Sequence, residues 1–218
     1  MNNKVKTPED ILLINKSKGI TSFDVIRQLR KKLGIRKMGH AGTLDPLASG
    51  LMIIGVENGT KKLSDYIKLD KSYVADILLG RKTTTGDMEG EILEEAKVYF
   101  VEDDYIKELM EAFHGEFELL PPIYSAIKKD GKPLYKYARS GEEVEILPRK
   151  MKVYKSEFLG SDKVEEGFVI RASFDVASGV YIRSLVQKIG ELLGAPATLY
   201  DLKRTKIGDF DLKKAVDL

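Results

Sequence analysis

Apolar residues recur along this chain with two different periods, and together they predict short strands interleaved with amphipathic helices. Residues 10–15 (DILLIN) and 51–56 (LMIIGV) are compact apolar runs that predict buried strands, and residues 71–80 (KSYVADILLG) predict another. In residues 168–176 (FVIRASFDV) every second side chain is apolar, which predicts a strand with one buried face.

Other segments have the spacing of helices that are apolar on one side. In residues 22–34 we expect Ser22 to cap the N-terminus and Gly34 to cap the C-terminus, with one face formed by Val25, Ile26, Leu29 and Leu33. Residues 58–67 predict the start of a helix, residues 101–114 an amphipathic helix and residues 182–194 a helix that ends at Gly194. Because helices and strands do not alternate regularly, we expect an α+β fold with a mixed, largely antiparallel sheet.

Composition narrows the possible chemistry. The chain has 218 residues, 43% of them hydrophobic, which suits one domain or two small ones. It has no cysteine and two histidines, His40 and His114, so thiol chemistry and a histidine-rich metal centre are excluded. No P-loop, dinucleotide-binding or metalloprotease motif is present, and we expect no metal and no cofactor. Without a signal peptide or an apolar run long enough for a membrane helix, we expect a cytoplasmic protein.

Charge is distributed unevenly. Residues 16–40 contain eight Lys or Arg against one acid, Asp24, and residues 86–118 contain twelve acids against two lysines. Such runs are usually solvated helix faces. Here the basic run leads directly into the most unusual segment of the chain, which favours a polyanion such as RNA as a partner.

That segment, residues 38–56 (MGHAGTLDPLASGLMIIGV), contains four glycines, no Lys or Arg, and one carboxylate, Asp45. An isolated acid in apolar, glycine-rich surroundings is a candidate for chemistry. Asp-Pro is also a common start of a turn or helix, so Asp45 could be an N-cap with Pro46 as the first helical residue. By elimination Asp45 is the best nucleophile candidate.

The block GHAGTLDPLASGLMIIGVENGTKKL resembles the catalytic block of the TruB family of tRNA pseudouridine-55 synthases. Four further blocks resemble that family in the same order: INKSKGITSFDVIRQLR, KSYVADILLGRKTTTGDMEGE, LPPIYSAIKKDGKPLYKYARSGEEVE and SGVYIRSLVQKIGELLGAPATLYDLKRT. The resemblance implies a pseudouridine synthase fold, with residues 1–218 forming a single catalytic domain and no C-terminal PUA-type domain. It also implies a cofactor-free isomerisation of uridine 55 in the T-loop of tRNA, on a base flipped out of its stack.

The resemblance also implies site residues. Asp45 matches the catalytic aspartate, and Arg183 the arginine that pairs with it, although a surface arginine at a helix start is the plainer alternative. Tyr73 matches a tyrosine that stacks on the flipped base, and Tyr181 one that could help move the C5 proton. Leu202 matches an apolar wall of the pocket. For these last three, ordinary packing inside the protein is the alternative.

RNA contacts are expected at two sets of residues. Lys16, His40 and Lys61 match family positions that touch the T-loop, and Arg36, Lys37 and Arg139 are expected to contact phosphates on charge grounds alone. We expect a monomer whose partner is tRNA, bound through its T-arm, with no membrane. Two alternatives stay open: a non-catalytic tRNA-folding chaperone, and an enzyme of the same class with a different RNA substrate.

Overall fold

A computed structural model describes residues 10–218 of the chain. Those residues belong to two compact units. The first unit contains the described chain up to Val74 together with Asp175–Ser178 and Asp201–Leu218, and the second contains Ala75–Phe174 and Gly179–Tyr200. The single catalytic domain expected over residues 1–218 stays a prediction, and the expected absence of a signal peptide mainly concerns residues 1–9, outside the described part.

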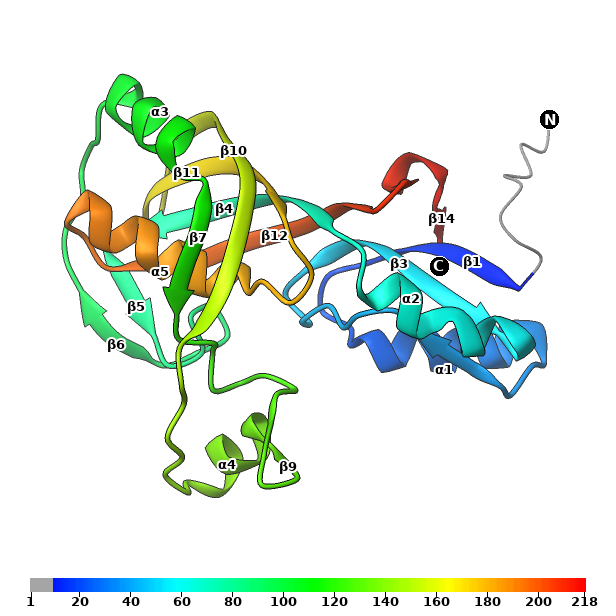
Figure 1. The fold of residues 1–218 in the computed structure, drawn as a ribbon. Coiled ribbons are helices and arrows are strands. Elements are labelled where there is room, and N and C mark those ends of the chain that lie inside the picture. Colours follow the sequence, from blue (N-terminus) through cyan, green and yellow to red (C-terminus); the bar gives the residue numbers. More distant parts are fainter. Residues whose placement is uncertain (1–9) are drawn as a thin grey trace. The chain divides into compact units, whose positions relative to one another are not determined.

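The first unit is built around the antiparallel pair β1 (Ile11–Lys16) and β3 (Ser49–Val56), in which Ile11 faces Gly55 and Lys16 faces Gly50. The C-terminal half of β12 (Ala197–Ile207) runs parallel to β3. Short strands extend this sheet: β2 (Met38–His40) on β3, β13 (Phe210–Asp211) on β12, and β14 (Val216–Asp217) parallel to β1. The helical segments of the unit are α1 (Ser22–Leu33), η1 (Glu57–Lys62), α2 (Leu63–Ile67) and η2 (Leu212–Lys214) (Figure 1).

Helix α1 follows its predicted bounds but not its predicted cap. Thr21, and not Ser22, caps the N-terminus, because the Thr21 side chain accepts from the Asp24 N–H while the Asp24 carboxylate accepts from the Thr21 N–H. Gly34 ends the helix in the left-handed conformation, as expected. The predicted burial of Leu33 is wrong, since this side chain is 46% exposed, whereas Val25, Ile26 and Leu29 are buried.

The second unit has its own run of neighbouring strands, in the order β4 (Lys71–Leu79), β11 (Gly167–Val176), β10 (Arg149–Val164), β7 (Gly115–Leu119). Helix α3 (Asp103–Ala112) contacts β10, and α5 (Ile182–Leu193) contacts β7. Two small hairpins also belong to this unit: β5 (Arg81–Thr83) with β6 (Ile92–Glu95), and β8 (Lys128–Lys129) with β9 (Lys132–Pro133). The short helix α4 (Leu134–Ser140) follows β9 and lies beside it (Figure 1).

The mixture of antiparallel and parallel neighbours confirms the α+β prediction. Strand β3 pairs antiparallel with β1 and β2 but parallel with β12, and β7 pairs antiparallel with β10. The predicted buried face of residues 168–176 is also confirmed, and Val169 on the other face is buried as well. The side chains of the predicted face are Phe168, Ile170, Ala172, Phe174 and Val176. Helix α5 ends at Gly194 in the left-handed conformation, as the sequence predicts.

Candidate active site

Asp45 lies in the irregular segment that joins β2 to β3, in the first unit. The residue is half-buried, and its carbonyl accepts a hydrogen bond from the Ala48 N–H at 3.1 Å, which closes a turn. No helix begins at Pro46, so the interpretation of Asp45 as a helix N-cap is wrong. The carboxylate is therefore carried by a tight turn next to a buried strand.

Hydrogen bonds hold this turn on both sides of Asp45. The hydroxyl of Ser22, at the start of α1, accepts from the Leu44 N–H at 2.8 Å and donates to the Leu44 carbonyl at 2.9 Å. After Asp45, the Pro46 carbonyl accepts from the Gly19 N–H at 2.9 Å and from the Lys16 ammonium at 3.3 Å. The backbone on either side of the carboxylate is thus fixed to β1 and α1.

Lys16 is completely buried, in contrast to a typical surface lysine. Its ammonium donates to the carbonyls of Ser17 at 3.0 Å and Ile20 at 2.7 Å, in addition to Pro46. These bonds give Lys16 a role inside the protein, and its expected contact with RNA stays a prediction.

Arg204 in β12 is another buried cation of the first unit, 1% exposed. Its Nε donates to the Leu51 carbonyl at 2.8 Å and its Nη2 to the Gly42 carbonyl at 3.2 Å. Gly42 has φ +87°, in the left-handed region that favours glycine. The guanidinium therefore contacts the backbone both before and after Asp45.

His40 ends β2 and is half-buried. Burial, and then the positive charge of Arg204, lower the pKa of His40 below 6.5, although a hydrogen bond with the Gly42 backbone opposes the shift. The imidazole is consequently neutral at pH 7, a form that can both donate and accept hydrogen bonds.

The remaining predicted residues of the first unit fall into two groups. Tyr73 and Leu202 are buried, 9% and 7% exposed, on β4 and β12. Arg36, Lys37 and Lys61 are exposed, as a phosphate-binding surface requires. Their predicted roles stay predictions.

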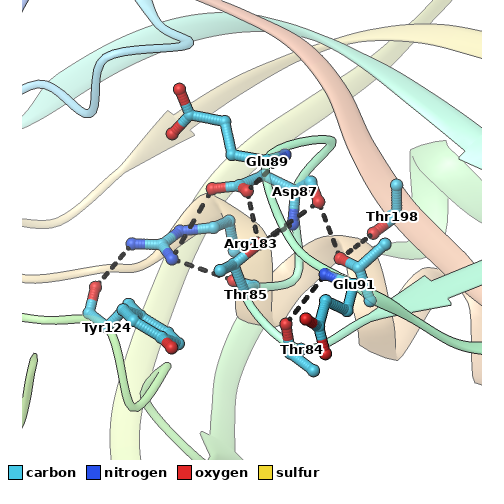
Figure 2. A network of polar contacts seen from close by, with 9 residues as sticks. Thr84, Thr85, Asp87, Glu89, Glu91, Tyr124, Arg183 and Thr198 are labelled. Carbon is cyan, nitrogen blue, oxygen red and sulfur yellow. Dashed lines mark hydrogen bonds and ion pairs between the residues drawn. The ribbon is translucent and has the colours of Figure 1, made fainter. Parts of the chain in front are cut away.

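Arg183, in the first turn of α5, belongs to the second unit and is 6% exposed, so the alternative of a surface arginine is wrong. Its guanidinium donates to the carbonyls of Thr85 and Tyr124, each at 2.9 Å. Nη1 also lies 3.7 Å from the Asp87 carboxylate, which is 4% exposed. Figure 2 shows these partners converging on the planar head group. The predicted pairing of Arg183 with Asp45 stays a prediction.

Asp87 is held in turn by its own loop. One carboxylate oxygen accepts from the Thr85 hydroxyl at 2.5 Å and from the Glu89 N–H at 3.1 Å (Figure 2). The Asp87 carbonyl accepts from the Thr83 hydroxyl at 2.7 Å, and that hydroxyl lies 3.0 Å from the Thr198 hydroxyl. A chain of buried polar contacts thus connects Arg183 to β5 and β12.

The other two predicted residues of the second unit are Tyr181 and Arg139. Tyr181 is half-buried at the N-cap of α5, where its carbonyl accepts from the N–H groups of Ser184 and Leu185. Arg139 is exposed in α4, with its guanidinium carbon 5.6 Å from the centre of the Tyr135 ring.

Three residues were not predicted from the sequence as members of these groups: Ser22, Asp87 and Arg204. For Arg204 a signal existed. Leu202 and Arg204 lie two residues apart in β12 and so on the same face of the strand, which places an arginine at an inward position. For Asp87 the signal was an acid that directly follows Gly86 and three threonines, at the end of the segment TTTGD. Nothing in the pattern distinguishes Ser22 from an ordinary helix-start serine.

Among residues 10–218, no three His, Cys, Asp or Glu side chains gather closely enough to hold a metal ion. In the same part of the chain, no helix is long and apolar enough to cross a membrane.

Comparisons with known proteins agree with one another. Residues 30–182 match the TruB family pseudouridylate synthase N-terminal domain. A relative from Endomicrobium trichonymphae, named tRNA pseudouridine synthase B, is 39% identical over 216 residues, which are 99% of this chain and 92% of the relative. A protein of the same name from Aromatoleum aromaticum is 42% identical over 210 residues, covering 96% of this chain and 67% of that protein.

Among solved structures, a chain of a Cbf5–Nop10–Gar1 complex superimposes with a TM-score of 0.71 at 30% identity. The match covers 96% of this chain and 52% of the solved one, so this chain spans about half the length of that neighbour. A chain of an H/ACA ribonucleoprotein bound to a substrate RNA superimposes with a TM-score of 0.68 at 27% identity, covering 95% of this chain and 50% of the other.

Proposed function

This chain belongs to the TruB family of pseudouridylate synthases and has their fold, and from that premise we propose that it isomerises uridine 55 in the T-loop of tRNA to pseudouridine. The reaction breaks the N1–C1′ bond of the uridine, turns the base and joins C5 to C1′. Product and substrate have the same mass, and the protein needs only to hold an acidic group beside the ribose of a flipped base.

The observation that carries the proposal is the setting of Asp45. It is the single carboxylate of residues 38–56, and its turn is bonded through the backbone on both sides, to Ser22 and to Gly19. A catalytic group must be held to within a fraction of an ångström of its productive position. A turn fixed in this way meets that requirement, and we assign Asp45 as the catalytic carboxylate.

Tyr73 and Leu202 supply the apolar surface for the uracil in this proposal. Both side chains are largely buried in the first unit, so they can present a ring face and a methyl surface without flexibility. Stacking of a base on an aromatic ring contributes about 1–3 kcal/mol and tolerates rotation of the base in its plane. This tolerance suits a reaction in which the uracil must turn before it is rejoined.

Arg183 and Tyr181 act from the second unit. We assign Arg183 to pair with the reacting carboxylate, with Asp87, Thr85 and Tyr124 fixing the plane of its guanidinium. Tyr181 is assigned to the proton that leaves C5. The exposed cations Arg36, Lys37, Lys61 and Arg139 are assigned to RNA phosphates, with His40 at the T-loop.

Tritium release from a T-loop stem-loop containing [5-³H]uridine tests the proposal. The wild-type protein should release tritium without added metal or nucleotide, and Asp45→Asn should abolish release while RNA binding is retained. Asp209→Asn, which removes an exposed acid of the same unit, is the matched control and should react normally. Full turnover by Asp45→Asn would refute the assignment of Asp45.

The same proteins can be tested for refolding of misfolded tRNA. If the wild-type protein refolds tRNA but releases no tritium, the chain is a chaperone and not an isomerase. We further propose that the protein acts as a monomer in the cytoplasm, since one copy of the chain carries every assigned residue.

A further inference from the structure

Arg204 is among the largest side chains that are almost completely buried in this protein, at 1% exposure. A guanidinium is not deprotonated in proteins, so it is charged inside the first unit. Burial of a charge is costly unless its hydrogen bonds are satisfied, and those of Arg204 go to two backbone carbonyls. A buried cation so placed calls for an explanation other than packing, because an apolar side chain would pack at lower cost.

The two carbonyls lie on opposite sides of Asp45 in the sequence. Gly42 stands in the segment that leaves β2, and Leu51 stands in β3. One rigid, planar group therefore connects the beginning and the end of the segment that carries the carboxylate. A guanidinium presents its donors in a rigid, planar fork, whereas the ammonium of a lysine on its flexible stem fixes the separation of two partners less tightly.

The backbone around Arg204 leaves this segment little freedom. Arg204 and Gly50 are register partners in the parallel pairing of β12 with β3. A Cβ on Gly50 would lie 2.3 Å from the Arg204 carbonyl oxygen, and Gly50 has φ +107°. At Gly42 a Cβ would lie 3.6 Å from Nη1 of the arginine, which is ordinary contact. The exit of the turn is thus pressed directly against the strand that supplies the guanidinium.

Ser22, at the start of α1, restrains the segment that carries Asp45 from a second element. Its hydroxyl bonds both the N–H and the carbonyl of Leu44, the residue before Asp45, and the side chain is 3% exposed. Arg204 and Ser22 thus restrain the segment from β12 and from α1.

We propose that Arg204 is a positioning residue that acts through Asp45, with Ser22 as a second and weaker one. The proposal rests on the assignment of Asp45 under the proposed function. The guanidinium sets the distance between the ends of the turn and thereby the position of the carboxylate. Its loss should slow the reaction more than it weakens RNA binding, because the exposed cations assigned to RNA are elsewhere on the chain.

The test compares Arg204→Met and Arg204→Lys in tritium release from the T-loop stem-loop, with kcat and KM determined separately. A displacement of about 1 Å costs about 100-fold in rate, so we expect Arg204→Met to lower kcat by about that factor with KM changed less than about threefold. Arg204→Lys should recover part of the loss, since an ammonium can satisfy one of the two carbonyls.

Ile11→Ala is the control for general destabilisation. Ile11 is 1% exposed and faces Gly55 at the far end of the β1–β3 pair, away from the turn. This variant should lower Tm without changing kcat. Three results would overturn the positioning role. Arg204→Met could retain the wild-type kcat, or lose no more rate than Ile11→Ala at a similar Tm. It could also raise KM by the same factor by which it lowers kcat.

If neither Arg204 variant folds, Ser22→Ala decides the matter. We expect it to lower kcat by about tenfold, since the bonds from Arg204 remain, and an unchanged kcat would overturn the proposal. Asp45→Asn is assayed in parallel. An inactive Asp45→Asn together with a fully active Arg204→Met would refute only the positioning role, whereas turnover by Asp45→Asn would refute the assignment on which it rests.

Discussion

Replacement of Asp87 by asparagine should strongly destabilise the second unit. The amide keeps an oxygen that can accept from the Thr85 hydroxyl and the Glu89 N–H, so the loop keeps its local bonds. What is lost is the negative charge 3.7 Å from the Arg183 guanidinium, which is 6% exposed. Removal of one partner of a buried ion pair costs about 3–5 kcal/mol, because the other charge loses a stabilising contact without returning to water.

The lower end of that range applies here, because Arg183 keeps its bonds to the Thr85 and Tyr124 carbonyls. We therefore expect a loss of about 3 kcal/mol in the free energy of unfolding. For a chain of this size each kcal/mol lowers Tm by about 2–4 °C, so the expected decrease is about 6–12 °C.

Asp76→Asn is the matched control. Asp76 pairs with Arg171 through two bonds of 2.7 and 2.8 Å, shorter than the contact of Asp87 with Arg183, but the Arg171 side chain is 60% exposed. An ion pair open to solvent contributes about 1 kcal/mol or less. If burial decides the strength of an ion pair, Asp87→Asn should lose more unfolding free energy than Asp76→Asn. If contact distance decides it, Asp76→Asn should lose more.

Urea unfolding of Asp87→Asn, Asp76→Asn, Arg183→Met and the double variant Asp87→Asn/Arg183→Met measures these losses of unfolding free energy. The double variant should lose less stability than the sum of its singles, by about 1–3 kcal/mol, since each single variant already removes the contact between the two charges. An Asp87→Asn variant no less stable than Asp76→Asn, or strictly additive losses in the cycle, would refute the reasoning.

Three further predictions use other parts of the chain. Gly50→Ala should lower the free energy of unfolding by about 3 kcal/mol or more, since its Cβ would lie 2.3 Å from a carbonyl oxygen. The control Gly34→Ala meets no atom within 4 Å and should cost about 1 kcal/mol in thermal unfolding, so equal losses would contradict this prediction. Because the pKa of His40 is lowered from 6.5 by burial and then by Arg204, its contribution to stability is complete above pH 6.5 and declines as the pH falls through the native pKa. His40→Gln should therefore flatten the loss of unfolding free energy between pH 7 and 5, and an unchanged profile would count against it. Lys61→Ala should weaken RNA binding and reduce its salt slope by about one, while Lys107→Ala in α3 should leave the slope unchanged.

Much of the fold could be predicted because local pattern and tertiary packing agree. The alternation in β11 and the helical spacing of α5 are each matched by the burial of the same side chains in the structure. The error at the start of α1 has a tertiary cause. Ser22 has the chemistry of an N-cap, but its hydroxyl bonds Leu44, a residue 22 positions away, and Thr21 caps the helix instead. No local rule contains that contact.

The candidate site was predictable only in part. Asp45 could be found because it is isolated among glycines and apolar residues and because its block resembles a known family. Arg204 and Asp87 were missed because they act on backbone carbonyls or on another side chain distant in the sequence, Arg183. A pattern of residue types reports which faces are buried, but not which main-chain groups need a partner.

Two buried cations of the first unit make the same kind of contact. Lys16 and Arg204 are both almost completely buried, and both donate to main-chain carbonyls of the segment around Asp45, at Pro46 and Gly42. Apolar residues in their place would fill the same space but would remove a charged donor from each of these carbonyls, leaving the Pro46 carbonyl with the Gly19 N–H. Burial of two such cations beside one turn costs stability that apolar residues would not cost. That cost is expected where the position of the carboxylate assigned to catalysis must be fixed.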